Sequence, residues 1–336
     1  MRERALEGVG AVSGPWNDRR VLVTGATGIV GAWLVRALLE QRSTVVALVL
    51  DADSQSELYR SGDIRCVSVV NGALEDFRTL EQAILTHGVD SVFHLGAQAI
   101  VDIAHRAPLA TFETNIRGTY NLLEVCRLHA DRVRRVVVAS SDKAYGEQAH
   151  LPYTEETPLD GRYPYDVSKS CADLLAQSYH YSYGLPVAIA RCGNVYGGGD
   201  LHWDRIVPGT IRSLLRGERP IIRTDGTYVR DYLYVKDCVA GYLALGDAID
   251  RVAGEAFNLS TESWVTVSEI VTTMQKIIGR TDLDPIVQNV ARGEIRSQSL
   301  SARKARERLG WQAAFDLERG LAETVAWYEA FFGVAR

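Results

Sequence analysis

The sequence predicts an α/β protein in which a doubly wound parallel sheet is joined to a smaller, mostly C-terminal substrate-binding lobe. Three observations support this fold. Short β-branched runs alternate with longer helical patterns from Arg20 to Cys192, an early strand leads through a glycine turn into a helix, and the alternation stops after Cys192. At 336 residues the chain also exceeds the usual size of one compact core.

The expected strands are continuously apolar, which is typical of parallel strands that are buried on both faces. They are VLV at 21, TVVALVL at 44, CVSVV at 66, SVFHL at 91, RVVVAS at 135 and PVAIAR at 186. Helical patterns at about 30–41, 77–88, 108–129 and 165–183 lie between them and are long enough to serve as right-handed crossovers.

Glycine and proline residues interrupt the chain after Cys192, and a strand-like segment, YVRDYLYV, begins at Tyr228. We therefore expect an N-terminal tail at 1–17 and a first domain at 18–193, to which 228–260 return. The second lobe is expected to comprise 194–227 and 261–336. Two lobes of this kind predict a cleft between them.

The composition is that of an ordinary globular enzyme, with 46% hydrophobic and 24% charged residues. A net charge of −5 without a long basic block argues against nucleic acid as a partner. Five scattered cysteines without ligand spacing indicate reduced thiols and no metal site. We find neither a signal-peptide core nor a segment approaching the roughly 20 apolar residues of a membrane helix, so we expect a cytoplasmic protein without a membrane partner.

The segment VLVTG runs into GATGIVG at 25–31 and then into a helix that begins AWLVRALLE. Glycines at such a turn allow the backbone to approach a pyrophosphate, and the helix N-terminus adds partial positive charge. The context predicts a Rossmann dinucleotide site. Its expected residues are Gly25, Thr27, Gly28, Ile29 and Gly31.

Asp51 lies 20 residues beyond Gly31, at the end of the second expected strand. A carboxylate there can bind the adenosine ribose hydroxyls and repel a 2′-phosphate, which favours NAD over NADP. Asp53 is a possible substitute for Asp51, and a solvated strand-end acid is the alternative interpretation.

The segment YDVSK places the Tyr165 phenol and the Lys169 ammonium four residues apart, on one face of a helix. A phenol with a pKa of about 10 is a poor base at neutral pH, but a fixed cation favours the phenolate and lowers that pKa. Because this helix follows a strand that ends in Ser140 and Ser141, the pair is predicted to be catalytic.

These motifs resemble the extended short-chain dehydrogenase/reductase family of nucleotide-sugar epimerases and dehydratases, from about Trp16 to Trp327. The resemblance implies that Tyr165 takes the proton of the sugar's carbon-4 hydroxyl while hydride passes to the nicotinamide. It implies that Lys169 holds the nicotinamide ribose and that Ser141 hydrogen-bonds the reacting hydroxyl. It also implies a homodimer that pairs helices near 108–129 and 165–183.

The same resemblance extends the NAD site beyond the glycine turn. It assigns Ala73, where the family usually has Asp, and Leu74 to the adenine pocket. The HLGAQ turn at 94–98 would lie beside the cofactor, with Asn115 matching the family's helix asparagine. The further cofactor residues are then Ala73, Leu74, Leu95, Ala97, Gln98 and Asn115, whereas we interpret His94 as a packed strand-end histidine.

Asp142 and Lys143 follow Ser141 directly, as in dehydratases with Asp-Lys, which include the CDP-glucose 4,6-dehydratases; many other dehydratases have Asp-Glu. Simple 4-epimerases commonly carry small residues there. Oxidation at carbon 4 acidifies the carbon-5 hydrogen, so dehydration needs a further base and acid. The resemblance makes Asp142 the acid, with a raised pKa, and Lys143 the base or the group that stabilises the enolate. A strand-end salt bridge or loop pair is the alternative.

The stretch NVYGGGD at 194–200 and the RDxxYVxD-like stretch at Arg230 resemble the family's substrate segments. Arginine suits diphosphate because its guanidinium binds phosphate oxygens in a bidentate manner. The candidate substrate residues are Asn194, Arg205, Arg230 and Arg292, with Arg296 as a substitute for Arg292.

The sequence therefore predicts an NAD-dependent nucleotide-sugar 4,6-dehydratase that forms a 4-keto-6-deoxy sugar. A 4-epimerase of the same fold is the alternative, and a non-catalytic NAD-binding regulator is a more remote one. The sequence leaves the nucleotide base and the sugar of the substrate open.

Overall fold

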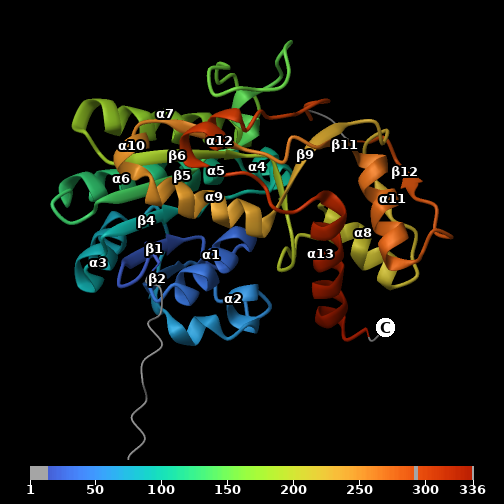
Figure 1. Cartoon of the computed structure of the whole chain (residues 1–336), viewed down its shortest axis with the longest axis horizontal. Coiled ribbons are helices and arrows are strands. Elements are labelled where there is room, and N and C mark those ends of the chain that lie inside the picture. The colour runs from blue at the N-terminus through green and yellow to red at the C-terminus, as the bar shows by residue number, and fades with distance from the viewer. Residues whose placement is uncertain (1–13, 291–293, 335–336) are drawn as a thin grey trace, which may run out of the picture.

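A seven-stranded, fully parallel sheet forms the centre of the protein in a computed structural model that describes residues 14–290 and 294–334 (Figure 1). Its strand order is β10-β6-β5-β4-β1-β2-β3. The strands are β1 (Arg20–Thr24), β2 (Thr44–Val49), β3 (Ser68–Asn71), β4 (Ser91–His94), β5 (Arg135–Ala139), β6 (Val187–Cys192) and β10 (Ala256–Leu259). All six predicted strands are confirmed, and the order reverses between β1 and β4, the crevice where such sheets bind ligands.

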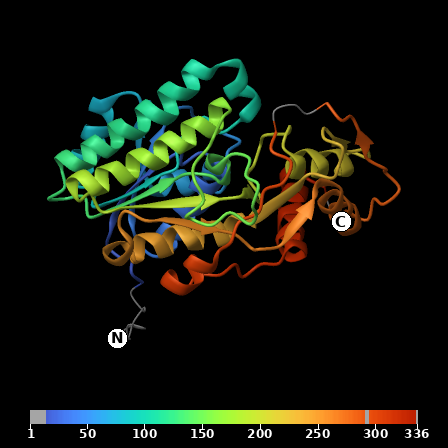
Figure 2. The same ribbon diagram turned by 90° about the horizontal axis from the view of Figure 1, so that it is seen from above.

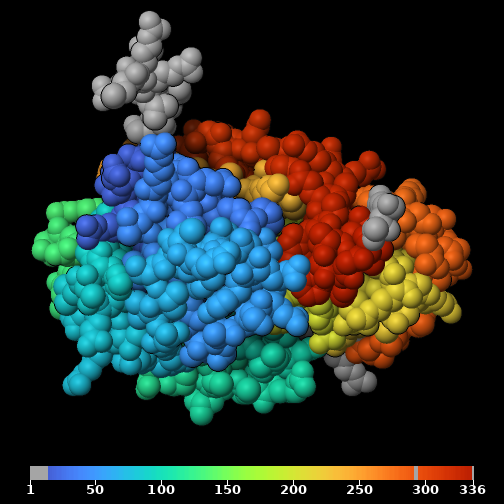
Figure 3. Space-filling view, turned by 90° about the horizontal axis from the view of Figure 1, so that it is seen from below, coloured from blue at the N-terminus to red at the C-terminus, as the bar shows by residue number. Residues whose placement is uncertain are grey.

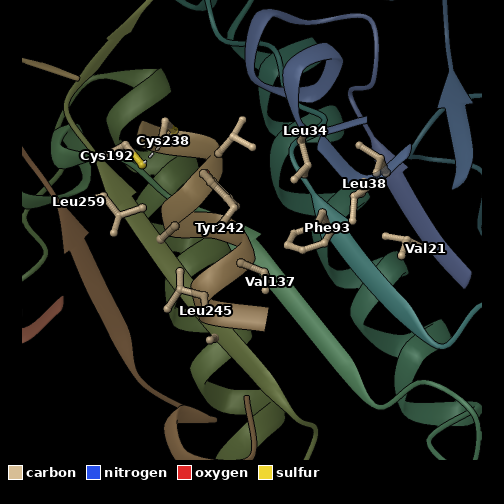
Figure 4. Packing of buried hydrophobic residues seen from close by; sticks show 14 of the residues in the cluster. Val21, Leu34, Leu38, Phe93, Val137, Cys192, Cys238, Tyr242, Leu245 and Leu259 are labelled. Atoms are coloured by element: carbon tan, nitrogen blue, oxygen red, sulfur yellow. Dashed lines mark hydrogen bonds between the residues drawn. The ribbon is translucent and has the colours of Figure 1, made fainter. Parts of the chain in front are cut away.

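Helices cover both faces of this sheet (Figure 2). On one face lie α3 (Phe77–His87), α6 (Gly118–Leu128) and α7 (Pro164–Tyr183), and on the other α1 (Ile29–Glu40), α9 (Val235–Asp247) and α10 (Ile249–Val252). Successive strand residues point to opposite faces, so Leu22 packs in the core beneath α3 whereas Val21 and Val23 face α1. Tyr242 and Leu245 of α9 fill the latter core (Figure 4). The doubly wound prediction is confirmed.

The helix expected at 108–129 is broken. The chain forms α4 (Val101–Arg106) and α5 (Pro108–Phe112), then a π-helical turn, η2 (Glu113–Arg117), before α6 begins. The wide turn brings the side chain of Asn115 into the protein, where it hydrogen-bonds Gln98 and Ser168. Tertiary hydrogen bonding of this kind lies outside what apolar periodicity can indicate. No helix in the described part of the chain is long and apolar enough to cross a membrane.

The second lobe packs three helices around a small sheet. The sheet has the order β11-β9-β7, from β7 (Asn194–Tyr196), β9 (Val229–Tyr234) and β11 (Trp264–Thr266). The helices are α8 (Ile206–Leu215), α11 (Val267–Ile278) and α13 (Leu317–Phe332), and β8 (Ile221–Ile222) pairs with β12 (Ile286–Val287). Their apolar sides share one core, which includes Ile211, Met274 and Tyr328.

The two lobes are more interleaved than the sequence indicates. Residues 228–260 were expected to return to the first domain. Of the elements in this range, α9 and β10 lie with the large sheet, whereas β9 belongs to the small one. We expected all of 261–336 in the second lobe, but α12 (Arg303–Leu309) packs on β10, with Lys304 Nζ donating to the carbonyl of Ala256 at 3.0 Å. Trp16, which we expected in the tail, is 1% exposed and packs against Phe93 in the core of the first domain.

The C-terminal helix α13 also contacts the first domain, at α2 (Glu57–Arg60) beyond β2. The indole N–H of Trp327 donates to Glu57 Oε2 at 2.9 Å, and the Arg60 guanidinium lies 4.5 Å from the centre of the Phe331 ring. In Figure 3 the red atoms of α13 lie directly against the blue atoms of this region. A 3-10 turn, η1 (Asp63–Cys66), follows α2.

Candidate active site

The candidate site lies where the carboxyl end of β5 meets α7 and the second lobe. Ser140 and Ser141 follow β5, and a 3-10 turn, η3 (Asp142–Tyr145), comes directly after them. The first turns of α7 pack against η3 and carry Tyr165 and Lys169. Binding at the carboxyl ends of the strands is the rule for open α/β sheets.

Lys169 is fixed within the first domain. Its side chain is buried, and Nζ donates to the carbonyl of Ala139, the last residue of β5, at 2.8 Å. Burial lowers the pKa of the Lys169 ammonium to about 8. The lysine is therefore held one helical turn from Tyr165, at the edge of the sheet.

Tyr165 differs from the sequence-based expectation, in which the Lys169 charge lowers the pKa of its phenol. Burial instead raises the pKa of Tyr165 to about 12, because the phenolate loses more by desolvation than nearby charges return. Two influences lower this pKa. The larger is the positive charge of Arg205, from the second lobe, and the smaller is a hydrogen bond with Ser141. Arg205 is thus the positive charge that does most to favour the phenolate.

Asp142 is a buried carboxyl beside these groups, with 2% of its surface exposed. It accepts a hydrogen bond from the Ser141 hydroxyl at 3.1 Å. Burial raises the pKa of Asp142, although the charges of Lys143 and Arg230 oppose the change. A raised pKa is the direction that the role of a general acid requires.

Lys143 lies next to Asp142 without pairing with it. Lys143 Nζ donates to Gln298 Oε1 at 3.2 Å, and Gln298 Nε2 donates to Asp142 Oδ2 at 3.2 Å. Sequence reasoning missed Gln298 because it lies 155 residues from Lys143, in a stretch without a motif of its own. Asp142 and Lys143 therefore do not form the salt bridge given as the alternative in the sequence analysis, because the Gln298 amide lies between them.

Asp231 of β9 is a second buried carboxyl of the site, after Asp142. Sequence reasoning did not identify it. One oxygen accepts from the Ser260 hydroxyl and from the Leu300 N–H, and the other has no hydrogen-bond partner among the described residues. Burial raises the pKa of Asp231 to about 7, and the negative charge of Asp142 adds to this. The Arg230-Asp231 pair in the sequence is a signal for it, although the prediction includes only the arginine.

The glycine turn between β1 and α1 has the shape of an anion site. Gly25 has a φ of +68°, and a Cβ there would lie 2.8 Å from the backbone nitrogen of Gly96. A Cβ at Gly31 would lie 2.1 Å from the Gly25 carbonyl oxygen. Gly28 precedes α1 without a side-chain cap, so the N–H groups of the first turn, at Ile29, Val30 and Gly31, stay available to a ligand. Thr27 completes the turn.

The structure distinguishes the two acids beyond β2. Asp53 Oδ1 accepts the N–H of Gln55 at 2.8 Å and so stabilises the loop that leads to α2. The carboxylate of Asp51 is exposed, and within the described ranges it has no hydrogen bond or ion pair. Asp51 is therefore the acid available to a ribose.

The remaining predicted cofactor residues line the turn after β4. Asn115 is 2% exposed, and its amide holds this turn by bonds to both backbone groups of Gln98 and to the Ser168 hydroxyl. Its place is therefore behind the turn, which it links to α7. Leu74 is buried against Gly96 and Gly118. Ala73 precedes Leu74, and Leu95 and Ala97 belong to the turn itself.

His94 is a packed histidine, as we interpreted it. Its ring nitrogens lie 2.9 Å from the Thr24 hydroxyl and 3.0 Å from the Thr119 hydroxyl. Burial, with a smaller contribution from the Lys169 charge, lowers the pKa of His94 to about 3. The ring is therefore neutral at physiological pH and serves to join β1, β4 and α6.

The predicted substrate residues Asn194, Arg205 and Arg230 belong to β7, the start of α8 and β9 of the second lobe. Arg205 donates to Asp200 at 3.0 Å, and the buried Arg230 pairs with Glu294 at 3.2 Å. Asn194 carries a buried amide nitrogen for which the described residues provide no partner. Arg292 lies outside the described residues. The substitute Arg296 is 67% exposed and pairs with Asp225 at 3.5 Å.

Across 14–290 and 294–334, no group of three or more His, Cys, Asp or Glu side chains is placed to hold a metal ion. The groups of the site that can exchange protons are the phenol of Tyr165, the side-chain amino groups of Lys143 and Lys169, and the carboxyls of Asp142 and Asp231.

Known proteins resemble this chain over almost its whole length. The CDP-glucose 4,6-dehydratase of Salmonella typhimurium is 31% identical over 94% of this chain and 92% of the enzyme. A dTDP-glucose 4,6-dehydratase of Streptomyces venezuelae, solved with NAD bound, superposes with a TM-score of 0.85 at 29% identity, covering 94% of this chain and 98% of the other.

A UDP-glucose 4-epimerase of Thermotoga maritima, solved with UDP-glucose, superposes with a TM-score of 0.86 at 30% identity, covering 93% and 99% of the two chains. The fold is therefore shared by dehydratases and epimerases. Residues 22–324 match the family described as GDP-mannose 4,6 dehydratase. With its Rossmann sheet, glycine turn and Tyr165–Lys169 pair, the chain belongs to the GDP-mannose 4,6 dehydratase family.

Proposed function

We propose that the protein is an NAD-dependent nucleotide-sugar 4,6-dehydratase. The observation that supports this most is the buried Asp142 beside Lys143, directly after Ser141 and next to Tyr165. Dehydration needs an acid and a base in addition to the groups that serve oxidation at carbon 4, and this pair supplies both.

The turn between β1 and α1 fits NAD. Close backbone approach at Gly25, the uncapped start of α1 and the free carboxylate of Asp51 suit a pyrophosphate and an adenosine ribose. The carboxylate would repel a 2′-phosphate, which favours NAD over NADP. Bound there, NAD would accept a hydride from carbon 4 of the sugar and return a hydride to carbon 6.

The protein's part in the first step is to move one proton. Tyr165 removes it from the carbon-4 hydroxyl, while Ser141 holds that hydroxyl and Lys169 holds the nicotinamide ribose. The raised pKa of Tyr165 makes its phenolate a strong base once formed, and the Arg205 charge stabilises that phenolate. We assign the substrate diphosphate to Arg205, Arg230 and Arg292, with Asn194 beside it.

The second step uses Asp142 and Lys143. The carbon-5 hydrogen is acidic once carbon 4 is a ketone, so Lys143 removes that proton or stabilises the enolate. Asp142 gives its proton to the carbon-6 hydroxyl, which departs as water. Carbon 5 then regains a proton as carbon 6 receives the hydride, so the sugar loses one water in total and the cofactor is restored.

The test is to incubate the enzyme with CDP-, dTDP-, GDP- and UDP-sugars in deuterated water and record proton NMR spectra. A dehydratase gives a new 6-methyl signal and deuterium at carbon 5. The alternative, a 4-epimerase, inverts carbon 4 without exchange at carbon 5, and that result would overturn the proposal. A non-catalytic NAD-binding regulator would leave every sugar unchanged, but we would expect such a protein to have lost Tyr165 or Lys169.

We further propose a homodimer that acts in the cytoplasm. Exposed apolar side chains gather on α5, α6 and α7. Of these helices, α6 and α7 lie side by side in Figure 2. They are Leu109, Tyr120, Leu128, Leu174, Tyr181 and Tyr183. Covering such a face with a second copy removes it from water, and the five free thiols suit a reducing compartment. A monomeric mass at micromolar concentration would contradict the dimer.

A further inference from the structure

A single side chain from the second lobe bridges the acid and the base of the elimination step. The amide of Gln298 faces Lys143 with its oxygen and Asp142 with its nitrogen, at 3.2 Å in each case. Gln298 is fully buried, so its amide is shielded from water. Each end of the amide meets the partner that its polarity suits.

The backbone around Gln298 is fixed by the elements on either side. Its N–H donates to the Val229 carbonyl at 3.1 Å, and the carbonyl of Ser299 accepts the Tyr153 N–H at 2.8 Å. The Arg296 carbonyl accepts from the guanidinium of Arg230 at 3.2 Å. One extended segment therefore supports a candidate diphosphate arginine and the amide that touches Asp142 and Lys143.

We propose that Gln298 is a positioning residue that keeps Asp142 and Lys143 from forming a direct ion pair, so that one remains an acid and the other a base. In an ion pair the carboxyl would be ionised and the amine protonated, which is the opposite of what the elimination requires. An interposed neutral amide lengthens the distance between the charges and weakens their attraction in proportion. This role rests on the proposed dehydratase function.

Other charged groups also face this pair and bear on its protonation. Arg230 and Asp231 of β9 face Asp142, and Asp166 of α7 faces Lys143. The phenols of Tyr153 and Tyr165 complete the surroundings of Asp142. Because Gln298 contacts Asp142 and Lys143 directly, substitutions there change the pair while leaving these neighbours in place.

Two variants test the role in the NAD-bound enzyme. Gln298→Met keeps the length of the side chain but removes both hydrogen bonds, so Asp142 and Lys143 can pair directly. Gln298→Glu keeps the shape but adds a negative charge between them. Gln275 is the matched control, because it is also a buried glutamine of the second lobe and donates to the Leu283 carbonyl, away from the site.

In both Gln298 variants we expect kcat for dehydration to fall by about 10- to 100-fold, with KM nearly unchanged and NADH formation retained. In Gln298→Glu the acidic limb of the kcat profile should move up by about one pH unit or more, because the added carboxylate stabilises the Lys143 ammonium. Gln275→Met and Gln275→Glu should leave kcat and its pH profile unchanged, whatever their effect on thermal stability.

A measurement without turnover separates this role from the proposed function. The chain has five lysines, so NMR of ¹³C-labelled lysine side chains can follow the titration of Lys143, identified by its loss in Lys143→Met. The midpoint of that titration should rise in both Gln298 variants and stay unchanged in the Gln275 variants. An unchanged midpoint in Gln298→Glu would overturn the inference, whereas a wild type that forms no 6-deoxy sugar would overturn the function.

Discussion

The two lysines of the site are held in different ways. Lys169 hydrogen-bonds a backbone carbonyl of β5, so both its helix and its partner belong to the first domain. Lys143 hydrogen-bonds the side chain of Gln298, which comes from the far end of the sequence. In the proposed mechanism, oxidation at carbon 4 is thus supported mainly by the first domain, whereas the elimination depends on how the two lobes meet. The two steps should accordingly respond to different substitutions.

Tyr165→Phe should have the largest effect, because it removes the proposed base of the first step, without which the second step cannot begin. We expect kcat to fall by about 10⁴-fold, at the upper end of what a placed proton-transfer group contributes. NADH should not form in a single-turnover absorbance experiment. Tyr163→Phe, at an exposed tyrosine two residues earlier, is the matched control. Rapid NADH formation by Tyr165→Phe would show that another group takes the proton.

Lys143→Met should separate the two steps. It retains most of the apolar stem and removes the nitrogen, so we expect dehydration to slow by about 10²- to 10³-fold. Hydride transfer should persist, and NADH-bound enzyme with 4-keto sugar should accumulate while carbon 5 exchanges slowly with deuterated water. The exposed Lys276→Met serves as control. Dehydration at the normal rate would remove Lys143 from the mechanism.

Asp51→Ala should weaken cofactor binding while leaving the balance between the two steps unchanged. Hydrogen bonds to a charged group contribute about 1.5 to 3 kcal/mol, so the Kd for NAD should rise by about 10- to 100-fold. NADP binding should weaken less, because a repulsion disappears together with the contact. Fluorescence titration measures both constants, with Asp53→Ala for comparison. Equal weakening of the two cofactors would contradict the assignment.

His94→Gln should have the smallest effect and should appear in stability. The folded pKa of His94, about 3, lies below the unfolded value of about 6.5, so only the unfolded chain gains this proton as the pH falls below 6.5. Wild-type stability should therefore decrease by about 2 kcal/mol between pH 6.5 and 5 from this group. Urea unfolding should show a shallower loss in His94→Gln. An identical slope would mean that His94 is protonated in the folded protein, and the exposed His150→Gln is the control.

Features that depend on neighbours in the sequence were predicted well. The apolar runs identify six of the seven strands of the large sheet, and the spacing of the glycines between Gly25 and Gly31 indicates the β1–α1 turn. Both depend on short-range backbone geometry, which a local pattern reports directly. The break at η2 escaped prediction because it follows from the tertiary contacts of Asn115.

Features that depend on distant neighbours were predicted less well. The spacing of Tyr165 and Lys169 gives their relation along a helix, but not the burial that raises the pKa of the phenol, nor the approach of Arg205. Gln298 and Asp231 reach the site only through the packing of β9 and the segment before α12. Burial and long-range charge arise from the assembled fold, so a single sequence contains no local sign of them.

The interleaving of the two lobes has a consequence for how substrate enters. The chain passes between the large and small sheets from β6 to β7, from β9 to α9 and from β10 to β11, and it leaves α12 for α13 in the same way. The contact of α13 with α2 adds a tether at the outer edge. A hinge that opened the cleft would have to bend all of these connections together, unlike hinges that involve only a few residues. We therefore expect surface loops beside the site, and not a movement of the two lobes, to let the sugar in. Small-angle scattering should accordingly give the same radius of gyration with and without nucleotide sugar.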